Sequence, residues 1–409
     1  MSYSSVGKPK FYIDYLSYLK TMGAIEDAYF THTTTGNVNP IGLNPTEPSI
    51  FGPIPGYNPS YKIELNQYLH PDMLASINYL GLIGHTYNSK NFSANESYPN
   101  SYMQLHFDTA GPNGFQGSIA PEDFDQNIIN TELSPDEDGI RFPNNGFSLT
   151  NVAFSGNSFD EVSIFNIKLR RRNFGNNPDG DLEDMLTYFM INSLILGHTY
   201  TMPRSPDLSL SMEIEYEGFD EQTTLSGSTL TNVRYTGQPL WGGLLNPWEI
   251  GGNGEQFSYI STDPGNYEDD IAGAPLNPNY LNSDSTLKRS GRRIWSLKWS
   301  YISETDMFAS NYSSNTWLNI NDIDNNYTPY TDNNDADDNE FTYTIADDSS
   351  IQSKLFHFIG NGARFLFQPN ENASNPSDFA ICVLDQDSLN IKQVAYNTYN
   401  ISMKIREVW

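Results

Sequence analysis

Two of the chain's six histidines sit in nearly identical hexamers, LIGHTY at residues 82–87 and ILGHTY at residues 195–200. Paired histidines can ligate a metal or act as acid and base, but such sites need further ligands at close spacing. Neither His85 nor His198 belongs to an HxH or HExxH pattern. Each motif follows an apolar run, and its glycine permits a tight bend or a close backbone approach. The sequence therefore favours two structural corners at strand ends over a catalytic pair.

Clusters of acidic residues are the second group that could do chemistry. Carboxylate oxygens suit calcium, and the runs NPDGDLED and DNNDADDNE supply several of them. The calcium candidates in these runs are Asp179, Asp181, Asp335 and Asp337. None of the runs has the spacing of an EF-hand loop, so the preferred interpretation is a solvated acidic loop. No metal or other cofactor is expected.

Patterns for nucleophilic, phosphate or dinucleotide chemistry are missing from the sequence, which has no GxSxG, no Walker loop and no GxGxxG. Paired carboxylates for glycoside hydrolysis could lie anywhere among 50 acidic residues, and no motif singles out a pair. Trp295 and Trp299 share one strand face, which predicts packing in a core or an interface. Trp241 and Trp248 lie in a loop rich in glycine and proline and are candidates for a partner contact. We therefore expect a protein that is not an enzyme.

Charge and composition narrow the class of protein. The 22 basic and 50 acidic residues give a formal net charge of −28, which repels nucleic-acid phosphates and anionic lipids, so neither is an expected partner. No apolar segment predicts a signal peptide or a transmembrane helix. Cys382 is the single cysteine, which excludes an intrachain disulfide, and its apolar run FAICVL predicts a buried thiol.

Strand and turn signals predict a mainly β protein with three segments. Residues 1–60 are expected to form an N-terminal segment and an extended arm that is irregular from about residue 25. Residues 61–175 carry short strands between turn clusters and predict a jelly-roll, galactose-binding-like β-sandwich. Residues 176–409 predict an antiparallel β-barrel or sandwich with one flanking helix, interrupted by long insertions at about 218–290 and 310–346.

Periodicity within these segments predicts particular elements. The stretch FYIDYLSYLKTMG predicts a short strand that runs into a helical turn and stops at Gly23. Alternation from Leu208 to Tyr216, and again from Trp295 to Tyr301, predicts two strands with one apolar face each. The stretch DDSSIQSKLFHFIG predicts a capped helix with its apolar face made by Ile351, Leu355, Phe356 and Ile359.

The stretch ASINYLGLIGHTYNSKN resembles the strand-and-turn element of discoidin-like, galactose-binding-like jelly rolls in bacteriophage structural proteins, although Thr86 stands where Asn is common. A second resemblance covers most of the chain in ordered blocks, including FYIDYLSYLKTMG, LGHTYTMPRSPDLSLSMEIEYEG, SGRRIWSLKWSYISETDMF and MKIREVW. These blocks resemble a family of virion structural proteins of marine tailed phages. The resemblance implies a structural protein that is assembled in the host cytoplasm and resides in the virion.

The expected C-terminal architecture also resembles the tail-tube-like domain of tube, hub and distal tail proteins. This analogy implies a tail-associated ring or adaptor, a homo-oligomer that docks other virion tail or capsid proteins. The interface candidates are Phe11 and Tyr12 in the N-terminal segment and Trp241 and Trp248 in the loop. Two alternatives stay open: a carbohydrate-binding receptor-recognition protein that contacts a host surface glycan, and a capsid decoration protein.

Overall fold

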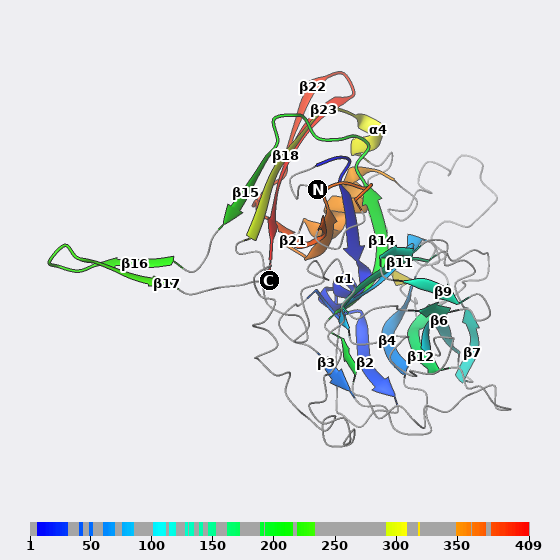
Figure 1. Ribbon diagram of the computed structural model, residues 1–409. Helices are drawn as coiled ribbons and strands as arrows, with labels where there is room; N and C mark the ends of the chain where they lie inside the picture. The colour runs from blue at the N-terminus through cyan, green and yellow to red at the C-terminus, as the bar shows by residue number, and fades with distance from the viewer. Residues whose placement is uncertain are drawn as a thin grey trace.

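The fold is taken from a computed structural model of the chain. The residues described are 6–31, 41–43, 49–51, 60–69, 76–85, 101–111, 114–119, 127–129, 131–134, 139–141, 146–152, 162–171, 189–191, 193–215, 219–233, 292–308, 318–319, 349–360, 362–373 and 378–408. Most elements in these ranges are antiparallel β-strands (Figure 1), which confirms the predicted mainly β class. They form two large sheets and two isolated pairs.

The larger sheet has eleven strands and extends through most of the molecule (Figure 1). In spatial order its strands are β15 (Ser211–Glu215), β18 (Arg292–Ser303), β23 (Thr398–Glu407), β21 (Ala380–Leu384), β20 (Phe365–Gln368), β1 (Lys10–Asp14), β14 (Ser193–Thr201), β5 (Tyr79–His85), β11 (Gly146–Asn151) and β8 (Asn127–Ile129), with β22 (Asn390–Ala395) attached to β23. Strands from all three segments of the sequence therefore share this sheet.

Strand β1 lies in the middle of the larger sheet. It pairs with β14 from Lys10↔Thr201 to Asp14↔Gly197, and with β20 through Phe11↔Phe367. Both faces of the sheet are buried here, because alternate residues enter two different apolar clusters. Phe11 and Ile13 enter one cluster, whereas Tyr12 enters the other. All seven residues of β5, YLGLIGH, are buried. Because both faces of the sheet are covered here, this strand lacks the alternation of polar and apolar residues that a half-exposed strand shows.

The smaller sheet has eight strands and packs against one face of the larger sheet in a sandwich-like arrangement. Its strands are β19 (Leu318–Asn319), β4 (Ser60–Leu69), β12 (Val162–Arg171), β6 (Ser101–Gly111), β10 (Gly139–Arg141) and β9 (Glu132–Ser134), with β2 (Ile25–Thr31) on β4 and β7 (Gly114–Ile119) on β6. The expectation of irregular chain from residue 25 is wrong for residues 25–31, because this segment pairs along β4.

The described helices are short, and α1 and α4 each begin at a side-chain cap. Helix α1 (Tyr15–Thr21) starts at Asp14, whose carboxylate accepts from Leu16 N and Ser17 N, and the chain leaves it through Gly23, as predicted. The predicted C-terminal helix is also confirmed, as a π-helical turn η5 (Gln352–Phe356) that continues into α5 (His357–Ile359). Helix α4 (Glu304–Met307) is a single turn. None of the helices in the described ranges has the length and apolar character needed to cross a membrane.

The four strands β15, β18, β22 and β23 form one end of the larger sheet, which we call the wing (Figure 1). Trp295 and Trp299 are fully buried on one face of β18, as their shared strand face predicts. Leu208 does not continue the predicted strand and is fully exposed. The reason is local: Asp207 N donates to Lys298 O (2.7 Å), so the chain forms a turn beside β18 before β15 begins.

Two pairs of strands stand outside the large sheets. Strand β3 (Ser49–Phe51) pairs with β13 (Phe189–Ile191). Strands β16 (Phe219–Thr223) and β17 (Thr229–Val233) pair with each other and with no other described strand, and they form a hairpin that projects from the body (Figure 1). We call residues 219–233 the hairpin arm. The sequence placed this segment inside a long insertion and did not predict a hairpin.

Candidate functional site

Asp14 joins three elements at the centre of the larger sheet. Its carboxylate accepts from Leu16 N (3.2 Å), Ser17 N (3.1 Å) and the Ser17 hydroxyl at the start of α1, and from Leu196 N (3.2 Å) of β14. Burial raises the pKa of Asp14 to about 6, against the opposing effect of these four donors. The carboxylate therefore holds the end of β1, the first turn of α1 and the neighbouring strand together.

His198 lies beside this junction and acts as a core residue. Its Nε2 donates to the backbone carbonyl of Lys354 (2.6 Å) in η5, which fixes the proton on that nitrogen. The ring packs at 5.1 Å from the Tyr15 ring and 5.2 Å from the Phe358 ring. Burial, helped by the nearby Lys354 charge, lowers the pKa of His198 to about 3. The histidine is therefore neutral and connects the sheet to the C-terminal helix.

His85, the other motif histidine, is also fully buried, and its Nε2 lies 2.7 Å from the Ser148 hydroxyl on β11. The two motifs lie on adjacent antiparallel strands, since β5 pairs with β14. Gly197 faces Tyr79, and His85 lies six residues farther along β5, so about 20 Å of strand separates the two histidines. They do not form one site.

The glycines of the two motifs, Gly84 and Gly197, have different structural roles. Gly84 has a φ of 61° and sits where the β5–β11 register shifts, so it makes the bend that the corner interpretation requires. Gly197 lies inside β14, and a Cβ there would stand 2.0 Å from the Ile13 carbonyl oxygen. The corner prediction is thus confirmed for the first motif and wrong for the second, where glycine allows close approach of β1.

A buried ion pair connects the two long strands of the wing. Arg293 donates from N and Nε to Glu407 Oε2 (3.0 and 3.1 Å), and from Nη2 to Glu407 Oε1 (3.1 Å) and the Phe379 carbonyl (2.8 Å). Both side chains are almost completely inaccessible. With its charges paired and its donors directed at fixed acceptors, this pair fixes the register of β18, β23 and the start of β21.

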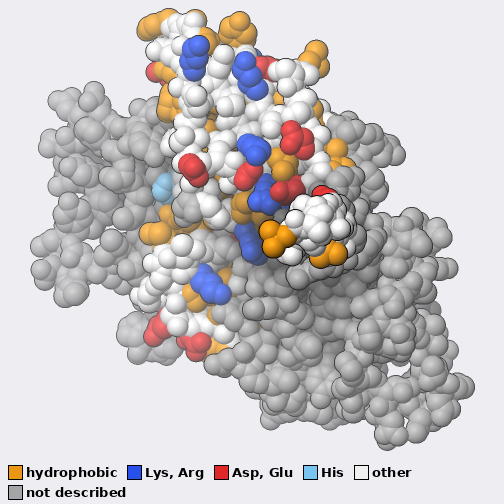
Figure 2. Space-filling model, turned by 90° about the vertical axis from the view of Figure 1, so that its left-hand side faces the viewer, with side chains coloured by type: hydrophobic (Ala, Val, Ile, Leu, Met, Phe, Trp, Pro, Cys, Tyr) orange, Lys and Arg blue, Asp and Glu red, His pale blue; other side chains and the backbone are white. Residues whose placement is uncertain are grey.

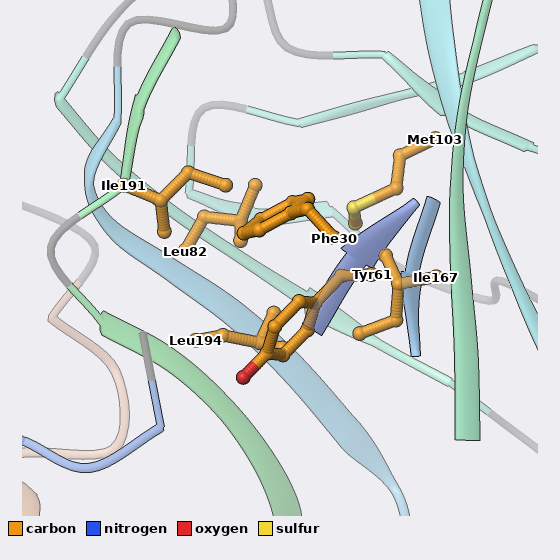
Figure 3. Close-up of a pocket in the computed structure, with 7 residues that line it drawn as sticks. All are labelled: Phe30, Tyr61, Leu82, Met103, Ile167, Ile191 and Leu194. Atoms are coloured by element: carbon orange, nitrogen blue, oxygen red, sulfur yellow. The ribbon is translucent and has the colours of Figure 1, made fainter. Parts of the chain in front are cut away.

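An apolar cavity of about 10 Å³ lies between the two sheets. Figure 3 shows its lining, in which side chains of the smaller sheet and of β5 and β14 point toward one another. The lining residues are Phe30, Tyr61, Leu82, Met103, Ile167, Ile191 and Leu194. A space of this size holds at most one water, so it is a packing gap in the sandwich core and not a ligand site.

The structure places the predicted site residues in two groups. Phe11 and Tyr12 are core residues with 0% and 1% exposure, so their expected role in intersubunit contact is corrected: their rings pack on Phe365, Phe367, Tyr79 and Phe379 of their own chain. Trp241 and Trp248 lie outside the described residues, as do the calcium candidates Asp179, Asp181, Asp335 and Asp337. Cys382 is buried, as predicted.

The exposed apolar residues mark surfaces that the sequence did not predict. Leu225 and Leu230 on the hairpin arm are 112% and 59% exposed. Figure 2 looks at the face of the molecule from which the arm projects, and it shows several Lys and Arg side chains over the wing with acidic ones between them. A serine-glycine turn flanked by alternating polar residues, TTLSGST, is the signal that could have revealed the hairpin.

Comparisons with known proteins give no relative. No family model matches the chain, and no curated protein matches it. Among solved structures, the arabinosyltransferase EmbB from Mycobacterium smegmatis aligns at 12% identity with a TM-score of 0.21. The alignment covers 40% of this chain and 14% of that chain, so this chain spans a small part of that protein's length. A likeness at this level carries no argument about fold or function.

Proposed function

We propose that the chain is a non-enzymatic structural protein of a tailed-phage virion that acts by self-association. The observation that carries this proposal is the hairpin arm, which projects from the body and whose strands pair with no other strand in the described part of the chain. An isolated two-stranded hairpin is at best marginally stable in water, so packing against a partner would stabilise it. The resemblance to marine-phage virion proteins supplies the setting.

The position within the virion is proposed by analogy. A projecting arm on one side and a receiving surface elsewhere on the chain make a head-to-tail contact, and such contacts close into rings when the rotation allows. A tail-associated ring or adaptor has this form. Its remaining surface would dock other virion proteins.

Electron microscopy of phage particles labelled with an antibody against this chain tests the proposal. A single ring of label at the tail is the expected result. Label spread over the whole head would contradict the tail position and favour a decoration protein. Absence of the chain from purified particles, measured by mass spectrometry, would contradict the virion role altogether.

A second candidate, recognition of a host surface glycan, is favoured by two exposed aromatic side chains. Tyr301 and Tyr396 are 67% and 89% exposed, and both lie at the end of the wing where β22 turns into β23. Exposed tyrosines offer an apolar ring face and a hydroxyl to a sugar. Binding of the purified chain to a glycan array, lost in a Tyr301→Ala, Tyr396→Ala variant, would support this function. Its absence would leave the structural role.

A further inference from the structure

The described contacts that hold the hairpin arm together lie within the hairpin itself. Strands β16 and β17 pair from Phe219↔Val233 to Thr223↔Thr229, and neither pairs with any other described strand. The turn between them is closed by Thr224, whose hydroxyl accepts from Ser228 N (3.1 Å). Leu225 at the turn is fully exposed. The arm is therefore a formed hairpin with an apolar tip and no cover from the described part of its own chain.

The charged residues of the hairpin arm are all acidic. Its fifteen residues, FDEQTTLSGSTLTNV, contain Asp220 and Glu221 and no Lys or Arg. Natural exposed strands usually carry lysine or proline that discourages pairing with another chain, and this hairpin has neither. An acidic hairpin without lysine or proline is suited to pack against a basic partner.

A basic surface exists on the wing. Its exposed or half-buried basic residues are Arg292, Lys298, Lys392, Lys404 and Arg406, against two acidic residues on the wing strand β15, Glu213 and Glu215, in a chain whose net charge is −28. The register places Lys298 opposite Ser402, Ser296 opposite Lys404, and Lys392 opposite Asn400. Because side chains alternate between the faces of a strand, these lysines share one face, opposite to the buried Trp295 and Trp299.

Two of the cations on this wing face are already paired within the chain. Lys404 Nζ lies 2.6 Å from Asp385 Oδ2, and Arg406 Nη2 lies 2.6 Å from Glu215 Oε2. Lys298 and Lys392 are exposed and form no ion pair with another described residue. Lys298 and Lys392 are therefore positioned to bind an external acidic group.

We propose that the hairpin arm docks on the Lys298–Lys392 face of the wing of a second copy of this chain. This inference rests on the proposed self-association and names its contact. Complementary charge selects the occupant: two copies with a net charge of −28 each repel unless their contact joins an acidic element to a basic one. Each copy offers one arm and one wing face, and in the structure the arm extends away from its own wing (Figure 1).

Sedimentation equilibrium of the full chain at about 0.15 M salt tests the contact. We expect the wild-type chain to self-associate. Leu225→Asp in the arm and the pair Lys298→Glu, Lys392→Glu in the wing are each expected to raise the dissociation constant at least about tenfold, since a central contact contributes more than about 1.4 kcal/mol. Lys8→Glu, an exposed lysine outside the hairpin arm and the wing strands, is the control and should leave it unchanged.

A charge exchange makes the assignment specific. Glu221→Lys alone should weaken association, and adding Lys298→Glu to it should restore most of the loss. The thermal midpoint of each variant, measured by circular dichroism, should stay at the wild-type value because Glu221, Leu225, Lys298 and Lys392 are all exposed. An oligomer that is unaffected by both the arm and the wing variants overturns this contact and leaves self-association standing. A wild-type chain that stays monomeric at high concentration overturns both.

Discussion

At the scale of single residues, Asp14 makes folding sensitive to pH. Its pKa is about 6 in the folded chain and about 4 when unfolded, so the folded state holds the proton more tightly. The stabilisation from this proton is complete below pH 4 and is lost as the pH rises through 6, about 3 kcal/mol in all. The free energy of unfolding of Asp14→Asn, relative to wild type, should therefore rise by this amount between pH 4 and pH 7.

Urea denaturation at several pH values measures that difference. Asp387→Asn, at an exposed loop position, is the control for the loss of one negative charge. A constant difference in the free energy of unfolding between wild type and Asp14→Asn over the whole pH range would show that burial does not shift the pKa of this carboxyl group.

His198 should show the opposite dependence. Its pKa is about 3 when folded and about 6.5 when unfolded, so its contribution to stability is present above pH 6.5 and is lost as the pH falls. The loss is roughly 2 kcal/mol by pH 5. His198→Gln keeps a donor for the Lys354 carbonyl and does not titrate, so its stability relative to wild type should improve on acidification.

His198→Phe separates the hydrogen bond from the titration. It should share the pH dependence of His198→Gln but cost about 1–3 kcal/mol at pH 7, because the Lys354 carbonyl loses its donor. Equal stability of the two variants at pH 7 would mean that the hydrogen bond contributes little.

Replacing one partner of the Arg293–Glu407 pair should lower the free energy of unfolding strongly. Glu407→Gln leaves a buried guanidinium without its counter-charge and is expected to cost about 3–5 kcal/mol. Replacing both partners by Met and Leu should cost less than this single change. Glu215→Gln removes the partner of Arg406 in a partly exposed pair and should cost less than about 1 kcal/mol, measured by the same denaturation experiment.

At the scale of elements, the two motif glycines should respond differently to alanine. Gly197→Ala puts a Cβ against the Ile13 carbonyl and the Tyr15 amide, so β1 must move and the cost should be at least about 3 kcal/mol. Gly84→Ala incurs the penalty of a positive φ, about 1–2 kcal/mol. Similar costs in thermal denaturation would contradict the distinction between close approach and bend.

Local periodicity was enough to predict several elements. The strand face of Trp295 and Trp299, the capped helix after Ser350 and the buried Cys382 all follow from short patterns. The place of β1 does not, because its partners lie near residues 200 and 367. The stretch FYIDYLSYLKTMG predicted a short strand and a helical turn, and only the sheet order reveals that both faces of this strand are covered.

At the scale of the whole molecule, sheet order gives a prediction about fragments. Residues 61–175 include β5, β8 and β11, which belong to the larger sheet, and β5 pairs with β14 outside that segment. The fragment 61–175 expressed alone is therefore expected to lack a cooperative unfolding transition. If residues 61–175 form an independent jelly roll, the fragment should unfold in a sharp transition without residues 6–24 and 176–409 added in trans. Such a transition would contradict our expectation and support a domain at residues 61–175.

The central position of β1 also bears on synthesis of the chain. Tyr12 bonds to Gln368 across 356 residues, so β1 is synthesised long before β20, one of its two neighbours in the sheet. At roughly 5–20 residues per second this interval lasts tens of seconds. During that time Phe11, Tyr12 and Ile13 have no final partner strand on one side, and contacts so distant in sequence form slowly. A nascent chain of this topology therefore has a long period in which β1 lacks one of its partner strands and depends on chaperones to stay free of aggregation.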